Sequence, residues 1–183
     1  MKYFNYHKNF YSRFLFFLFV FFAISNNMHS QEILDGEVKA GYIFNLPLFT
    51  KWPDYVANSP IKIGVYGNNP YGAALDKLKQ IKKDEGENWI VEYDIKVDEV
   101  EDYHIIIVNV VDNMEFIKLL NATGGKPIIT ITDRCDSFCK MGGILNFLQQ
   151  GSNKPFEIND VAARSSHLIF SSNLLRLAKI VVE

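Results

Sequence analysis

The stretch from Pro155 to Val182 holds the side chains best suited to chemistry, because charged and amide groups there stand beside apolar residues. These groups are Glu157, Asn159, Arg164 and Arg176. Polar groups close to a core must find partners. The stretch therefore forms either a structural ion pair or a binding site.

Glu157 is the strongest candidate within this stretch. It stands between Phe156 and Ile158 in an alternating run, so its side chain points away from theirs. If the two apolar residues face the core, Glu157 faces solvent, a cleft or a covering layer. In a covered position it needs a cationic partner, which Arg164 or Arg176 could supply.

Other signatures of catalysis are absent from the sequence. The loop Gly67–Gly72 has neither the dinucleotide-binding glycine pattern nor the P-loop Lys-Ser/Thr. There is no Gly-x-Ser-x-Gly elbow. His104 and His167 are too few and too far apart in the sequence to suggest a zinc site. We therefore expect no catalytic residue, no metal and no cofactor.

Residues 1–30 have the composition of a cleaved secretory signal peptide. Basic residues come first, Phe14 to Ile24 is almost wholly apolar, and Ser25 to Ser30 is mostly small and polar. Eleven apolar residues are too few to span a bilayer, which takes about 20. We expect cleavage after Ser30, export to an oxidising compartment, and a mature domain of residues 31–183.

The charge of the mature chain excludes one class of partner. Lys2, Lys8 and Arg13 belong to the signal, which leaves 16 of the 19 basic residues against 21 acidic ones, a net charge of about −5. A nucleic-acid-binding protein needs a basic face. We therefore expect no nucleic-acid partner.

The two cysteines, Cys135 and Cys139, are predicted to form a disulfide. Export to an oxidising compartment and an even count favour pairing. The ring is small, so pairing contributes at most about 2 kcal/mol and mainly fixes the local loop. The alternative is two buried or unpaired thiols.

The chain begins its fold with a predicted helix from Leu34 to Trp52. Its apolar stripe recurs every three or four residues, at Leu34, Val38, Tyr42, Leu46 and Phe49. Pro47 lacks a backbone donor and should kink this helix.

The middle of the chain alternates between strands and helices. Strands are predicted at Ile61–Tyr66, Trp89–Lys96, Ile105–Val111 and Pro127–Thr132. The run Ile105–Val111 is apolar and β-branched except for Asn109, which indicates a central strand buried on both faces. Such alternation predicts a mainly parallel sheet with helices on its faces.

The last third departs from this pattern. Ile144–Gln149 and Pro155–Asn159 flank a turn-like segment, which predicts an antiparallel hairpin at the sheet edge. A closing amphipathic helix is expected from Leu174, Leu177, Ala178 and Val181. The fold class is thus α/β: a single three-layer, Rossmann-like domain with a mainly parallel sheet and an antiparallel edge hairpin.

The mature sequence resembles the YfiR-like family of exported regulators over nearly its whole length. The resemblance lies in the order and spacing of several short segments: Val38–Asn45 with Trp52-Pro53, Ile61–Gly67 with Asn69–Gly72, Gly142–Phe147, Phe156–Asn159 and Ser171–Ala178.

This resemblance implies a periplasmic α/β protein, often a homodimer, that is not an enzyme. The best-known member holds an inner-membrane diguanylate cyclase inactive, which places it in cyclic-di-GMP signalling, and redox state and small ligands are implicated in release. The family's ligand pocket lies around the segments that match Phe156–Asn159 and Phe170–Ser172 here. Together with Arg164, the possible partner of Glu157, this gives Glu157, Asn159, Arg164, Ser171 and Ser172 as the expected ligand-binding residues. Disulfides in the family also favour pairing of the two cysteines.

Two departures from the family pattern matter for function. Pro47 replaces a helix former, and Ile169 stands where relatives often carry a basic residue, which weakens the case for an anionic ligand. A sensor histidine kinase could replace the cyclase as partner. The alternative function is a stand-alone periplasmic small-molecule binding protein.

Overall fold

The computed structural model describes residues 35–57, 60–148 and 152–181. The predicted signal peptide, residues 1–30, lies outside this part of the chain. The helices are a first helix (residues 35–45), η1 (Leu46–Phe49), α2 (Asp54–Ala57), α3 (Ala74–Asp84), η2 (Val97–Asp102), α4 (Asn113–Thr123), α5 (Asp160–Ser165) and α6 (Ser172–Leu177).

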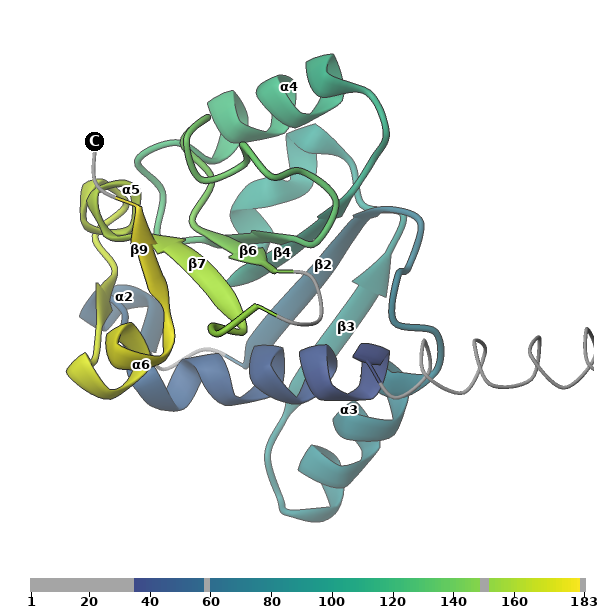
Figure 1. The fold of residues 1–183 in the computed structure, drawn as a ribbon. Coiled ribbons are helices and arrows are strands. Elements are labelled where there is room, and N and C mark those ends of the chain that lie inside the picture. Colours follow the sequence, from purple (N-terminus) through teal and green to yellow (C-terminus); the bar gives the residue numbers. More distant parts are fainter. Residues whose placement is uncertain (1–34, 58–59, 149–151, 182–183) are drawn as a thin grey trace, which may run out of the picture.

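The strands form one large sheet and one small ribbon. They are β1 (Thr50–Lys51), β2 (Ile61–Gly67), β3 (Trp89–Tyr93), β4 (Ile105–Asn109), β5 (Ile129–Thr132), β6 (Leu145–Phe147), β7 (Phe156–Asn159), β8 (Ile169–Phe170) and β9 (Lys179–Val181). The seven-stranded sheet has the order β3-β2-β4-β5-β6-β7-β9, and β1 pairs with β8. Figure 1 shows the large sheet running through the middle of the molecule.

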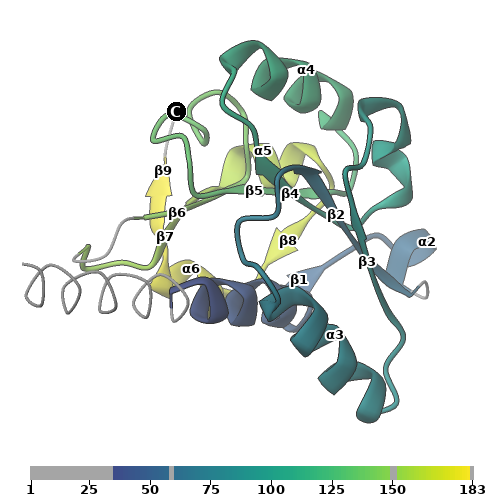
Figure 2. The ribbon, with the colours of Figure 1, turned by 90° about the vertical axis from the view of Figure 1, so that its right-hand side faces the viewer.

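The strand directions confirm the predicted fold class. Every neighbouring pair in the large sheet is parallel except β6 and β7, which are antiparallel. Helices cover both faces, with α4 on one side and the first helix and α3 on the other (Figure 2).

The end of the chain differs from the prediction. The closing helix stops at Leu177, Ala178 is extended, and Lys179–Val181 adds to β7 as a parallel strand. β7 offers an open edge of backbone donors and acceptors, and β-branched Ile180 and Val181 suit a strand. The antiparallel hairpin is therefore correct, but β9 rather than the hairpin forms the sheet edge.

The predicted first helix is too long. Its α-helical part ends at residue 45, and Leu46–Phe49 continues as a 3-10 helix that leads into β1. Pro47 has no N–H to continue the α-helical hydrogen bonds. The helix therefore ends near the proline instead of kinking at it.

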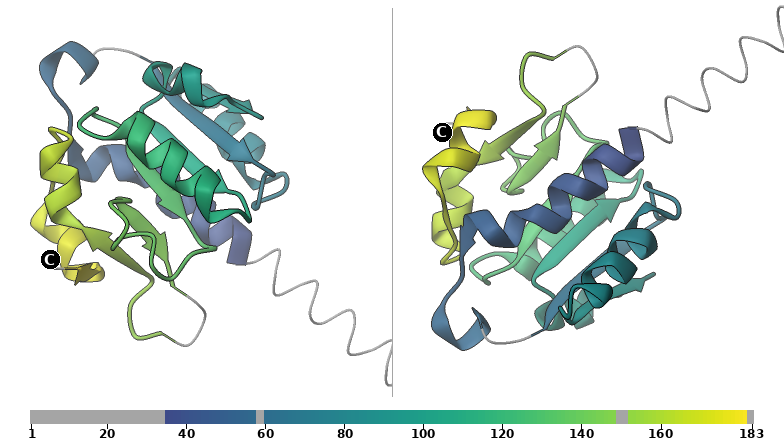
Figure 3. Two further views of the ribbon diagram at one scale, coloured as in Figure 1. Left: turned by 90° about the horizontal axis from the view of Figure 1, so that it is seen from above. Right: turned by 90° about the horizontal axis from the view of Figure 1, so that it is seen from below.

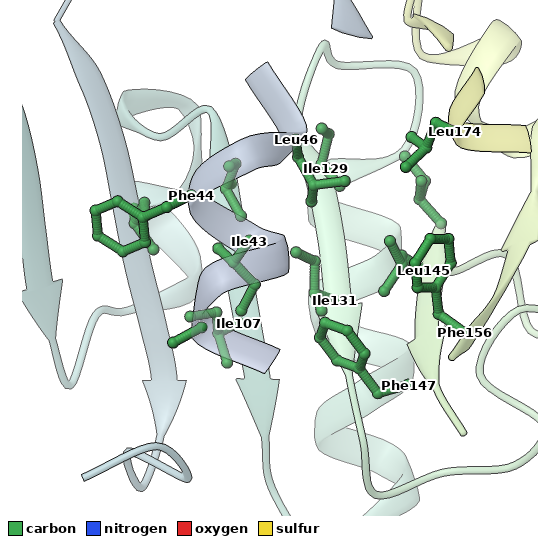
Figure 4. Packing of buried hydrophobic residues seen from close by; sticks show 14 of the residues in the cluster. Ile43, Phe44, Leu46, Ile107, Ile129, Ile131, Leu145, Phe147, Phe156 and Leu174 are labelled. Atoms are coloured by element: carbon green, nitrogen blue, oxygen red, sulfur yellow. The ribbon is translucent and has the colours of Figure 1, made fainter. Parts of the chain in front are cut away.

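The larger core lies between the sheet and the first helix. Ile43, Phe44 and Leu46 pack toward the strand residues of this face, as Figure 4 shows. In the view from below in Figure 3 the first helix crosses the sheet, and in the view from above α4 covers the opposite face. Both layers are needed because the central strand β4 has no exposed face.

Burial of β4 confirms the prediction of a central strand. Ile105, Ile106, Ile107 and Val108 are each 0% exposed. Alternate side chains enter the two separate cores. Each buried side chain of this size contributes about 1.5–3 kcal/mol, so the strand stabilises both layers at once.

Gly67 permits a close backbone approach between β2 and β4. Its φ is +88°, and a Cβ there would lie 2.3 Å from the carbonyl oxygen of Asn109. We predict that Gly67→Ala lowers the free energy of unfolding by about 2–3 kcal/mol, from left-handed strain and the clash.

Gly41→Ala is the matched control, measured in the same urea titration. Gly41 is helical and a Cβ there meets nothing within 4 Å, so alanine should raise stability by about 0.5–1 kcal/mol. Equal midpoints for the two variants would contradict the close approach at Gly67.

Candidate functional site

The five predicted ligand-binding residues lie in two different environments. Glu157 and Asn159 are on β7 and are 5% and 6% exposed. Arg164 is exposed on α5, and Ser171 and Ser172 are at the start of α6. The structure thus separates two interior groups from three closer to the surface.

Glu157 is held by groups that the sequence did not indicate. Asn146 Nδ2 donates to its Oε1 at 3.3 Å, and Lys179 Nζ lies 3.7 Å from its Oε2. The cations expected beside it are engaged elsewhere. Arg164 Nε pairs with Asp160 at 2.7 Å, and Arg176 donates to Asn173. Lys179 was missed because it was assigned to a helix, whereas the register of β9 places it opposite Glu157.

Asn159 and Ser171 each hold neighbouring segments of the backbone in place. Asn159 Oδ1 accepts from Ala162 N at 2.8 Å and caps α5, while its Nδ2 donates to Cys139 O at 2.7 Å. Ser171 Oγ caps α6, and its backbone N–H donates to Phe49 O at 2.8 Å. Both residues therefore hold the elements that carry the surface groups.

The predicted disulfide is absent from the structure, in which Cys135 and Cys139 are free thiols. The backbone between them turns helically, with Phe138 N–H donating to Cys135 O at 2.9 Å. Cys139 Sγ faces the interior near Ile144 O, and Cys135 Sγ lies 3.5 Å from Ser137 Oγ. The two sulfur atoms therefore have different neighbours, and a disulfide would require them to approach to bonding distance.

A surface groove of about 550 Å³ lies where two distant parts of the chain meet. One wall is Lys51–Tyr55, and the other contains Arg164, His167 and Ile169. The β1–β8 ribbon joins the walls, with Lys51 paired to Ile169. A second hollow of about 640 Å³ shares Tyr55 and His167 with it.

The groove combines apolar surface with positive charge. Tyr55 is 75% exposed and Ile169 is 54% exposed, although both side chains are apolar in large part. Lys51 and Arg164 add cations to the same lining. Lys51 pairs with Ile169 across the ribbon, so a cation stands beside this exposed apolar side chain. The groove therefore suits an aromatic or apolar group that carries negative charge.

His104 lines the neighbouring hollow as a neutral side chain. Burial lowers the pKa of His104, and its Nδ1 accepts the N–H of Lys62 at 3.2 Å. Trp52 packs edge-on against this imidazole and donates to Pro127 O at 3.0 Å. Trp52 lines the groove and His104 lines the neighbouring hollow, so these contacts hold the two linings together.

A family model described as YfiR/HmsC-like matches residues 36–179. The match spans nearly all of the first helix, the large sheet as far as Lys179 at the start of β9, and both groove walls. The chain belongs to the YfiR/HmsC-like family. A search of curated proteins gives no match.

Among solved structures, this YfiR/HmsC-like chain is similar to the crystal structure of a conserved domain protein from Vibrio cholerae O1 biovar El Tor. The two share 14% sequence identity with a TM-score of 0.46, over 79% of this chain and 59% of that chain. This similarity is too distant to bear on function. Across the described residues, no helix is long and apolar enough to cross a membrane.

The two thiols should differ in reactivity. Cys139 is 0% exposed, and burial followed by the charge of Glu157 raises its pKa to about 12. We predict that a thiol reagent at neutral pH labels Cys135 in the native protein and reaches Cys139 only after denaturation. Cys135→Ser should abolish the native-state labelling. Absence of labelling after denaturation without reductant would show a disulfide instead.

Alkali should destabilise the protein through the same thiol. The folded pKa of Cys139 lies above the unfolded value of about 8.5. Its contribution to stability is therefore complete below that value and is lost as the pH rises toward about 12. Urea midpoints should fall between about pH 8 and about pH 10.5, and fall less in Cys139→Ala. Equal slopes in both proteins would contradict the buried thiol.

Proposed function

We propose that this protein is a non-enzymatic periplasmic regulator that binds the periplasmic domain of an inner-membrane signalling receptor. The receptor is a diguanylate cyclase, which the regulator represses, or a sensor histidine kinase. Membership of the YfiR/HmsC-like family across residues 36–179 is the main support. The signal-like composition of residues 1–30 supports export.

The groove rim is the proposed contact surface for the receptor. Tyr55 and Ile169 both line the groove and are 75% and 54% exposed. Exposed apolar side chains that gather at one place mark interaction sites in soluble proteins. The ribbon β1–β8 holds this rim on two paired strands. A homodimer, which the family resemblance implies, remains a prediction.

A second candidate function is binding of a small ligand in the same groove. Its volume of about 550 Å³ falls in the usual range for ligand sites. Of the five expected ligand residues, Arg164 lines the groove. Asn159 and Ser171 cap the two helices, α5 and α6, that flank the β8 wall. We propose that Glu157 and Ser172 act in the same indirect way, by keeping β7 and α6 in place.

If the protein responds to redox state by pairing its two cysteines, the backbone near Cys135 would have to rearrange. The two thiols have different neighbours, Ser137 Oγ for Cys135 and Ile144 O for Cys139. Pairing would have to unwind the turn of residues 136–139, whose carbonyl at Cys139 accepts from Asn159. Oxidation would thereby loosen the cap of α5 and reach the groove wall that carries Arg164.

Receptor binding should depend on the apolar rim. We predict that Ile169→Asp, which places a charge among the exposed apolar groups, weakens recovery of the membrane receptor by ten-fold or more, or about 1.4 kcal/mol. The measurement is affinity capture from detergent-solubilised membranes of the native host, read by mass spectrometry. Circular dichroism checks that the variant is folded.

Val111→Asp is the matched control, since Val111 is 94% exposed and lies between β4 and α4, outside the groove lining. It should capture the receptor as well as the native protein does. Capture of no cyclase or kinase by native protein, with second-messenger levels unchanged on gene deletion, would refute the regulatory role. A ligand-induced rise in melting temperature that Arg164→Gln abolishes would then favour the small-ligand function.

A further inference from the structure

A separate cavity lies at the opposite end of the parallel strands from the groove and its neighbouring hollow. β2 leads through α3 to β3 on one side, and β4 leads through α4 to β5 on the other. The strand order therefore reverses between β2 and β4. In open α/β sheets, ligands bind beyond the carboxyl ends of the strands at such a point.

A cavity of about 380 Å³ opens beside this position. It is lined by Asp35, Lys39, Tyr71, Asp133 and Arg134, with Gly36 and Pro70. Its residues come from the first helix, the loop after β2 and the loop after β5. None of them lines the groove at the other end of the strands.

Lys39 lies between two carboxylates of the cavity. Its Nζ is 2.7 Å from Asp35 Oδ2 and 3.1 Å from Asp133 Oδ2. Burial opposes its charge, but the hydrogen bonds and charges of Asp35 and Asp133 together raise its pKa. The ammonium keeps a third N–H, and each carboxylate keeps its Oδ1, so all three groups can still bind a ligand.

Two further polar groups of the cavity lack partners. The Arg134 guanidinium is exposed and makes no hydrogen bond or ion pair with the described residues. Tyr71 is 4% exposed, and its hydroxyl has no hydrogen-bond partner in the part of the chain that the structure describes. Burial and then the charges of Asp133 and Asp35 raise the pKa of Tyr71, which keeps this hydroxyl a donor. An unpartnered buried hydroxyl is costly unless a ligand satisfies it.

The charges of the cavity balance. Lys39 and Arg134 are cationic, and Asp35 and Asp133 are anionic, so a simple anion or a simple cation would leave groups of its own sign nearby. A ligand that carries both charges satisfies all four. Its anionic group would meet Arg134 and the third N–H of Lys39, and its ammonium would meet the free carboxylate oxygens.

We propose that this cavity binds a small zwitterion of the α-amino acid class. Its carboxylate is received by Arg134 and Lys39, its ammonium by Asp35 and Asp133, and Tyr71 donates a hydrogen bond. The site is independent of the receptor surface and of the groove. It lies where the first helix joins the sheet, so occupancy strengthens that junction.

The test is a thermal-shift panel with the mature protein and each free L-α-amino acid at about 10 mM, a level that fills sites of millimolar affinity. At least one amino acid should raise the melting temperature by about 2–4 °C. Its N-acetyl and amide derivatives, each lacking one charge, should give no shift. Absence of a shift across the panel would overturn the proposal, as would equal shifts by the derivatives or by acetate.

Two variants locate the binding. Arg134→Gln should abolish the shift while leaving the melting temperature of the free protein unchanged, because Arg134 has no partner to lose. Lys140→Gln is the matched control: it removes an exposed cation of the same loop, outside the cavity lining, and should keep the shift. Tyr71→Phe should weaken binding at least ten-fold without lowering the stability of the free protein. A shift that survives Arg134→Gln would place the amino acid elsewhere and refute the site.

Discussion

Burial of β4 on both faces is the constraint on which the rest of the architecture depends. Four consecutive side chains of this strand are fully buried, so neither helical layer can be removed without exposing apolar surface. The first helix supplies one cover, and α4 with η2 supplies the other. The two cores are distinct, but they share this strand. Loss of packing in either core therefore destabilises the same strand, β4, and its hydrogen bonds to the neighbouring strands.

Beyond β4, the second face of the sheet becomes polar. Thr130, Thr132, Asn146, Glu157 and Asn159 are buried there under the loop that carries the cysteines. Thr130 accepts the N–H of Ile144, and Asn159 donates to the carbonyl of Cys139. Hydrogen bonds rather than apolar contacts therefore hold much of this loop. Because hydrogen bonds are directional, they fix the orientation of the loop on the sheet. Glu157 belongs to this network, which explains how a carboxylate can be buried in a strand.

Much of the fold could be predicted from the sequence, because for most elements the pattern of apolar residues matches the side chains that the structure buries. Ile105–Val108 reads as a doubly buried strand and is one. The predicted secondary structure was wrong where the spacing of apolar residues is compatible with both a helix and a strand. Ala178 and Val181 fit the spacing of a helix, but pairing with the open edge of β7 makes Lys179–Val181 a strand. Because Lys179 was assigned to that helix, its position beside Glu157 could not be predicted. The sequence also could not show that residues 51–55 and 164–169 form one groove, since only the ribbon β1–β8 brings them together.

That ribbon has a consequence for how the protein matures. Thr50 pairs with Phe170, so the connection closes a loop of about 120 residues, among the slowest steps in folding by contact order. The groove walls exist only after this closure. A chain in which this closure has not taken place would lack the groove, and with it the contact surface proposed for the receptor. The ribbon thus makes formation of the groove depend on completed folding of the whole domain.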